Sequence, residues 1–221
     1  MRPLTLLEVR ALGVLIEKAA TVPDSYPLSL NSLVAGCNQK NARDPVMNAT
    51  DAEVQAAADA LKALSLAFES SGSRVSRYEH NLGRALALPS QSVALLAVLM
   101  LRGPQTASEL RANCERLHRF ADTSSVEAFL DELATRADEK GGPLVVKLPR
   151  APGAREARWT HLLSGAVDTS AMPVAASDDD FVATSELAAL KAQQLSLKRE
   201  VDELRALVAR LYQELGVSRQ D

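Results

Sequence analysis

The chain has 221 residues, of which 47% are hydrophobic and 24% charged, and its formal net charge is −3. This apolar content is too high for a fully disordered chain, and two cysteines are too few for a disulfide-stapled secreted scaffold. The longest apolar run, Val93 to Leu101, is far shorter than the ~20 residues of a membrane span. Glu8 and Arg10 interrupt the apolar N-terminal stretch, which argues against a signal peptide. We therefore expect a globular, cytoplasmic protein with no membrane association.

Six helices are predicted along the chain, each from an N-terminal signal that precedes apolar residues at helical spacing. A Ser or Thr followed three residues later by Glu can satisfy two unpaired amides at a helix start. Four such capping boxes occur, at Thr5–Glu8, Thr50–Glu53, Thr106–Glu109 and Ser124–Glu127. Two further helices are predicted at Ser29–Cys37 and Ser90–Leu101, where a proline and a serine open the segment.

Four short strands are predicted to form two β-hairpins. Leu66–Ser70 and Val75–Glu79 flank a Ser-Gly-Ser turn, and Leu144–Leu148 and Ala157–Leu162 flank a longer loop. The order is therefore three helices and a hairpin, followed by three helices and a hairpin again.

The repeat is also visible in individual residues. Arg77-Tyr78-Glu79-His80-Asn81-Leu82 aligns with Arg158-Trp159-Thr160-His161-Leu162-Leu163, and Cys37 aligns with Cys114 on the second helix of each half. A duplicated unit of three helices and a hairpin is typical of tandem winged-helix domains. We predict a mainly α fold with small β-hairpins (α+β), in which residues 1–86 form the first winged-helix domain and residues 87–165 the second.

The C-terminal part of the chain has a different pattern. Residues 166–183 lack periodicity and are predicted to form a flexible linker, and residues 184–216 a coiled-coil helix that makes a parallel homodimer. Its predicted contact positions follow a heptad: Leu187, Leu190, Gln194, Leu197, Val201, Leu204, Val208, Leu211 and Leu215. Glu186 and Glu200 are placed opposite Lys191 and Arg205 of a parallel partner. The alternative is a helix that folds back onto its own chain.

Several longer motifs resemble those of a known family. They are Tyr26-Pro-Leu-Ser, Cys37-Asn-Gln-Lys, Arg43-Asp-Pro-Val-Met, Leu101-Arg-Gly-Pro-Gln-Thr and Pro149-Arg-x-Pro-Gly-x-Arg-Glu-x-Arg. Together they are similar to motifs of the YceH family of bacterial proteins, from about Thr5 to Gly165. The resemblance implies a tandem winged-helix fold with a variable C-terminal heptad helix. It brings no assigned activity.

Residue types that carry catalysis or bind metals form no recognisable site. The three histidines and two cysteines show no metal-ligand spacing, and no phosphate-binding loop or Ser-His-Asp pattern can be placed. His80 and His161 occupy equivalent repeat positions, which favours a shared structural role, and Cys37 and Cys114 are predicted to be core residues. We expect no enzymatic activity, no metal and no cofactor.

Nucleic-acid binding must rest on a local basic patch, because the charges of residues 1–168 balance. The third helices, predicted at Asp51–Ser65 and Ser125–Ala137, each carry a net charge of −2 and are poor partners for phosphate. The second hairpin is basic. Its candidate phosphate contacts are Lys147, Arg150, Arg155 and Arg158, and the first hairpin adds Arg74 and Arg77. Alternatively, Arg77 and Arg158, which share one repeat position, make structural bonds.

A polar loop after the second helix, residues 38–44, is another candidate site. Its Lys40 and Arg43 suit contacts with phosphates or bases, and the loop equally suits hydrogen bonds that tie the two domains together. The sequence thus favours a dimeric, non-enzymatic protein of regulatory or architectural type that binds double-stranded DNA. The alternative is a protein–protein scaffold that recognises a protein partner and does not bind DNA.

Overall fold

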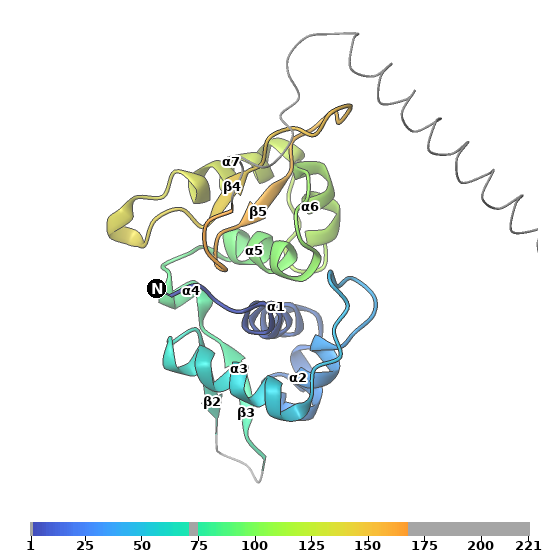
Figure 1. Cartoon of the computed structure of the whole chain (residues 1–221), viewed down its shortest axis with the longest axis vertical. Helices are drawn as coiled ribbons and strands as arrows, with labels where there is room; N and C mark the ends of the chain where they lie inside the picture. Colours follow the sequence, from blue (N-terminus) through green and yellow to red (C-terminus); the bar gives the residue numbers. More distant parts are fainter. Residues whose placement is uncertain (1, 71–74, 168–221) are drawn as a thin grey trace, which may run out of the picture. The chain divides into compact units, whose positions relative to one another are not determined.

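The computed structural model describes residues 2–70 and 75–167 (Figure 1). Within these ranges the fold is α+β, with seven α-helices, a three-stranded antiparallel sheet and a two-stranded antiparallel sheet. None of the helices in these ranges is long and apolar enough to cross a membrane. The predicted coiled coil (184–216), the predicted linker from residue 168 onward, and the predicted Ser-Gly-Ser turn with Arg74 lie outside the described residues.

The helices and strands follow the predicted repeated order, with several short additions. The first half comprises α1 (Leu6–Thr21), η1 (Pro23–Ser25), β1 (Leu28–Ser29), α2 (Leu30–Cys37), α3 (Asp51–Ala63), β2 (Ala67–Ser70), β3 (Arg77–His80) and α4 (Leu82–Ala85). The second half comprises α5 (Ser90–Arg102), α6 (Ala107–Cys114), α7 (Thr123–Ala134), η2 (Asp138–Lys140), β4 (Val145–Lys147) and β5 (Trp159–His161). The short elements β1, η1, α4 and η2 were not predicted, because two to four residues are too few to show a period.

Three of the four predicted capping boxes are confirmed. Thr5, Thr50 and Thr106 each accept a hydrogen bond from the amide of the glutamate three residues later, and that glutamate returns a bond. The prediction for Ser124 was wrong. Asp122 caps α7 instead, accepting from the Ser125 amide at 2.7 Å, because its extended backbone and its carboxylate precede the helix while Ser124 already lies inside the first turn. The predicted end of this helix at Ala137 was also wrong, since Thr135 ends it.

Both predicted hairpins are present, with shorter strands than predicted. β2 pairs with β3 so that Glu69 faces Tyr78, and β4 pairs with β5 so that Lys147 faces Trp159. The unpredicted strand β1 pairs with the other edge of β3, and the second half contains an equivalent bridge between Gln105 and Trp159. The two halves therefore repeat in the way their strands pair as well as in the order of their elements.

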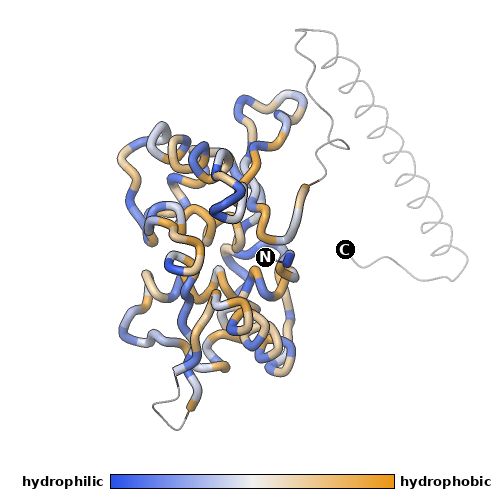
Figure 2. The backbone as a smooth tube through the Cα atoms, turned by 90° about the vertical axis from the view of Figure 1, so that its left-hand side faces the viewer, coloured by the Kyte–Doolittle hydropathy of each residue, from blue (hydrophilic) through white to orange (hydrophobic). Residues whose placement is uncertain are grey.

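Helix α1 packs against both halves. It contacts α2 and α3 on one side and α5 on the other, and its residues from Glu8 to Ile16 are all buried. Helix α5 is similarly buried from Ser92 to Leu101. Helices that are buried on nearly every face are apolar around most of their circumference, as expected for α1 and α5. Along much of the remaining backbone, hydrophilic and hydrophobic residues alternate (Figure 2).

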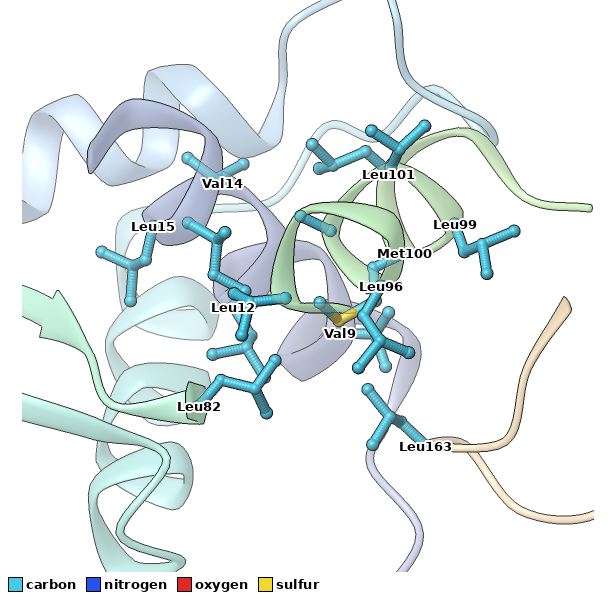
Figure 3. Close-up of a cluster of buried hydrophobic side chains, with 14 of the residues drawn as sticks. Val9, Leu12, Val14, Leu15, Leu82, Leu96, Leu99, Met100, Leu101 and Leu163 are labelled. Atoms are coloured by element: carbon cyan, nitrogen blue, oxygen red, sulfur yellow. The ribbon is translucent and has the colours of Figure 1, made fainter. Parts of the chain in front are cut away.

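The side chains between α1 and α5 form a shared core. Val9 and Leu12 of α1 lie close to Leu96 and Met100 of α5 (Figure 3). The predicted domain boundary at residue 86 falls between α4 and α5, yet buried side chains before and after it belong to one cluster. The described residues all belong to one compact unit.

The close packing of α1 on α2 leads to a stability prediction. A Cβ added at Gly36 would lie 2.4 Å from Cγ1 of the fully buried Val14, so Gly36→Ala should overpack this contact and lower the free energy of unfolding by about 1–3 kcal/mol. Urea unfolding followed by circular dichroism measures the loss. Val14→Ala in the Gly36→Ala background removes the obstructing methyl groups, so the loss in the double variant should be smaller than the sum of the two single losses. Simple additivity would contradict this interpretation.

Candidate nucleic-acid interface

The basic loop of the second hairpin, residues 148–158, projects from the fold on a pair of short strands. At its base the Leu148 amide donates to the Arg158 carbonyl at 2.8 Å, and the buried Leu148 side chain anchors the loop. At its tip the Ala154 amide donates to the Ala151 carbonyl at 3.0 Å, and Gly153 supplies the positive φ of +74°. The loop lies at the opposite end of the described unit from strands β2 and β3 (Figures 1 and 2).

Four cationic side chains of this hairpin are exposed, of which Arg158 is bonded to the protein and the other three are Lys147, Arg150 and Arg155. Lys147 lies beside the Trp159 ring, with Nζ 5.4 Å from the ring centroid. Arg150 and Arg155 form no hydrogen bond or ion pair with any residue that the structure describes. The loop's one acidic side chain, Glu156, accepts a hydrogen bond from Ser108 Oγ at 3.2 Å. The loop thus presents two unpaired guanidinium groups to solvent.

Arg77 and Arg158 are placed differently from the other candidates. Arg77 donates to the Pro27 carbonyl at 2.9 Å, and Arg158 donates to the Pro104 carbonyl at 2.7 Å and to Glu109 at 3.0 Å. Pro27 and Pro104 each precede the edge residue that bridges to the hairpin. Arg77 and Arg158, which share one repeat position, therefore both make structural hydrogen bonds. Each arginine links a hairpin to the segment that precedes the second helix of its half.

The polar loop at residues 38–44 is folded inward at Arg43. The guanidinium of Arg43 is buried, pairs with the Glu17 carboxylate through bonds of 3.1 and 2.6 Å, and donates to the Gly36 carbonyl. No phosphate can reach it in this position, so we exclude Arg43 from the candidate interface. Lys40 is exposed on the same loop.

The same loop contacts the second half of the fold. The Asp44 amide donates to the Leu101 carbonyl of α5 at 2.8 Å. Arg10 of α1 holds both ends of the loop, because its guanidinium donates to the Cys37 carbonyl at 3.1 Å and to the Pro45 carbonyl at 2.7 Å. The sequence analysis did not predict this role of Arg10. Its position inside an apolar helical stretch was a signal, because a buried arginine needs hydrogen-bond acceptors.

The histidines and cysteines at equivalent positions of the two halves are packed into the fold. Burial lowers the pKa of His80 and lowers that of His161 to about 4, so both rings are neutral near pH 7. Burial raises the pKa of the Cys37 and Cys114 thiols to about 12, which disfavours the nucleophilic thiolate. Among the described residues there is no cluster of three His, Cys, Asp or Glu side chains that could hold a metal ion.

The exposed faces of the third helices are acidic. Asp51, Glu53 and Asp59 are exposed on α3, where Lys62 bonds to both Asp59 and Glu69. On α7 the exposed acids are Glu127, Asp131 and Glu132. A helix with this negative charge repels phosphate. The basic loop is therefore suited to an anionic partner, and the third helices to a cationic one.

Comparison with known proteins connects this chain to a bacterial family. Residues 4–154 match the family model described as "Protein of unknown function, DUF480", a match that runs from the residue before α1's cap into the basic loop. The chain belongs to the DUF480 family. This membership confirms the resemblance drawn from the motifs.

Several proteins named UPF0502 protein are similar to this chain over nearly its whole length. The relative from Leptothrix cholodnii is 63% identical over 98% of this chain and 97% of its own length. The relative from Burkholderia multivorans is 64% identical over 98% of this chain and 91% of its own. The relative from Acidovorax sp. is 58% identical over 98% of this chain and 96% of its own.

Proposed function

We propose that this chain is a non-enzymatic tandem winged-helix protein that binds double-stranded DNA as a homodimer, through phosphate contacts of its basic loop. The repeated order of three helices and a hairpin, with matching strand pairing in both halves, supports the winged-helix assignment. In winged-helix proteins that bind DNA, the third helix commonly enters the major groove and the hairpin contacts the backbone nearby.

The observation that carries the proposal is the exposure of the Arg150 and Arg155 guanidinium groups, neither of which has a partner among the residues that the structure describes. An arginine without a carboxylate partner can bind a phosphate through two parallel hydrogen bonds, and it loses no existing ion pair when it does so. Lys147 adds a third positive charge at the base of the loop. The acidic third helices argue against base reading in the major groove, so we expect binding that depends weakly on DNA sequence.

The dimer is proposed from the heptad pattern of residues 184–216 alone. A second copy would double the number of basic loops on one assembly. The predicted linker, residues 166–183, would let two weak DNA contacts act together by raising the effective concentration of the second. The two hairpins of one chain lie at opposite ends of the described unit, so they do not form one continuous basic surface (Figure 1). The proposal therefore rests on the second hairpin, which carries Arg150 and Arg155.

The test is the salt dependence of binding to random duplex DNA, measured by fluorescence anisotropy. Two loops with about three cations each should give a slope of log K against log salt near −5, at roughly −0.9 per phosphate. Arg150→Glu with Arg155→Glu removes two contacts per loop and should flatten the slope to about −2. Arg116→Glu with Arg119→Glu is the matched control, because it makes the same charge change at exposed positions away from the hairpin. Absence of binding at about 50 mM salt contradicts the proposal.

A protein-recognition scaffold is the second candidate, favoured by the exposed carboxylates of α3 and α7. Reversing Glu127, Asp131 and Glu132 to lysine should abolish capture of a basic protein partner if this candidate is correct. The same change should leave DNA affinity unchanged or raise it if the basic loop is the interface. The two candidates are therefore separated by one set of variants.

A further inference from the structure

A groove of about 510 Å³ lies where the two halves of the fold meet. The C-terminal part of α1 forms one wall with Ile16 and Ala19, and the start of α5 forms another with Val93. Leu117, which follows α6, and Leu88 complete an apolar lining. Small-molecule sites in proteins are mostly apolar hollows of this size with a few polar groups that fix the ligand's orientation.

The groove has a single permanently charged side chain among its lining residues, Arg84 of α4. Arg84 is exposed, and its guanidinium makes no hydrogen bond or ion pair within the described part of the chain. Among the residues that the structure describes, neither aspartate nor glutamate lines the groove, and burial keeps the lining His80 neutral near pH 7 by lowering its pKa. The uncompensated charge at the groove is therefore positive.

The start of α5 adds to this positive character. Ser90 lines the groove and is the first residue of the helix, and the preceding Pro89 offers no side-chain cap to the first amides. The unpaired amides at a helix start carry a partial positive charge that favours an anion nearby. Here that end of the helix shares a groove with a partner-free guanidinium group and an apolar lining.

We propose that this groove binds a small amphipathic carboxylate, whose anionic head pairs with Arg84 and whose apolar body packs against Ile16, Val93 and Leu117. The charge and lining together select this chemistry, because a cation would meet Arg84 and a fully polar anion would leave the apolar wall exposed. The ligand contacts α1 of the first half and α5 of the second at once. This site is separate from the basic loop and does not depend on the proposed DNA binding.

Isothermal titration calorimetry of the full chain with octanoate tests the proposal, with octan-1-ol as a probe of similar apolar body and no charge. Saturable binding of octanoate is expected, with octan-1-ol at least about tenfold weaker. Arg84→Gln should weaken octanoate binding about tenfold or more, because it removes a charge-assisted pair, and should leave octan-1-ol binding unchanged. Arg155→Gln, the same substitution on the basic loop, should change neither.

A second variant and a second measurement test whether octanoate binds in this groove. Ala20→Leu adds bulk to the groove lining at an exposed position and should reduce octanoate affinity by about tenfold or more without a change in thermal stability. Methyl NMR spectra of the wild-type chain should show octanoate-induced shifts at Val93 and Leu117. Any one of three results overturns the proposal: no saturable octanoate binding, equal affinity in Arg84→Gln, or shifts confined to methyl groups outside the groove.

Discussion

Leu96→Ala is expected to lower the free energy of unfolding by about 2–5 kcal/mol. Leu96 is fully buried on α5, in the core that α5 shares with α1, so the substitution leaves a cavity that two packed helices cannot easily close. Because this core belongs to both halves, we expect both to lose stability together.

Two spectroscopic signals measure this effect separately. Trp159 is the only tryptophan in the chain and is buried in β5, so its fluorescence reports on the second half. Far-ultraviolet circular dichroism reports on the helices of both halves. The two urea transitions should shift together in Leu96→Ala, whereas a shift in fluorescence with a separate, unshifted dichroism phase would contradict a shared core. Leu6→Ala is the matched control, and since Leu6 is 56% exposed it should change stability by less than about 0.5 kcal/mol.

Arg43→Met is the second substitution with a large expected effect, a loss of about 3–5 kcal/mol near neutral pH. It removes the buried guanidinium from the pair and leaves the Glu17 carboxylate, which is only 16% exposed, with the longer contact to Lys18 at 3.5 Å as its remaining ion pair. It also removes the bond to the Gly36 carbonyl. The loop at residues 38–44 should lose its anchor to α1, and urea unfolding by circular dichroism measures the cost.

The pH dependence of this loss follows from the pKa of Glu17. Burial acts to raise that pKa, but the hydrogen bonds and charge of Arg43, with a smaller contribution from Lys18, outweigh burial and hold the pKa below its ordinary value. The pair therefore stabilises the fold above the unfolded-state pKa of Glu17, and this contribution is lost as the pH falls through the folded-state pKa. The difference between wild type and Arg43→Met should accordingly be largest near pH 7 and shrink in acid.

Two controls make this prediction specific. Glu17→Gln with Arg43→Met should be more stable near neutral pH than Arg43→Met alone, because no charge is left buried and unpaired. Arg158→Met breaks a pair with Glu109 that is exposed on both sides and should cost much less, since water screens that pair. A pH-independent loss in Arg43→Met would show that packing, and not the charge pair, holds the loop.

Local signals in the sequence located most helices correctly, because a capping box or an apolar period acts over a few neighbouring residues. Thr5, Thr50 and Thr106 begin their helices as predicted. Ser124 failed because two potential caps lie two residues apart, and the backbone of Asp122, which is extended, decides between them. The motif that suggested structural bonds for Arg77 and Arg158 also succeeded, because both halves reuse the same hairpin anchor.

The candidate site was predicted only in part. The exposed arginines of the basic loop could be identified, because a charged segment with prolines and glycine between two short strands is normally a surface loop. The inward position of Arg43 could not, because its partner Glu17 is 26 residues away, on α1. The groove beside Arg84 was equally hidden, because its lining comes from separate helices along the chain.

By itself the sequence determined the order of the elements, their duplication and the family to which the chain belongs. These features depend on short-range caps, periods and motifs that neighbouring residues carry together. Only the tertiary structure decided that α1 and α5 share one core, that Arg43 is buried while Arg150 and Arg155 are exposed, and that Arg84 lies at an apolar groove. These depend on which side chains the folded backbone brings together, and residue types and spacing alone do not specify those distances.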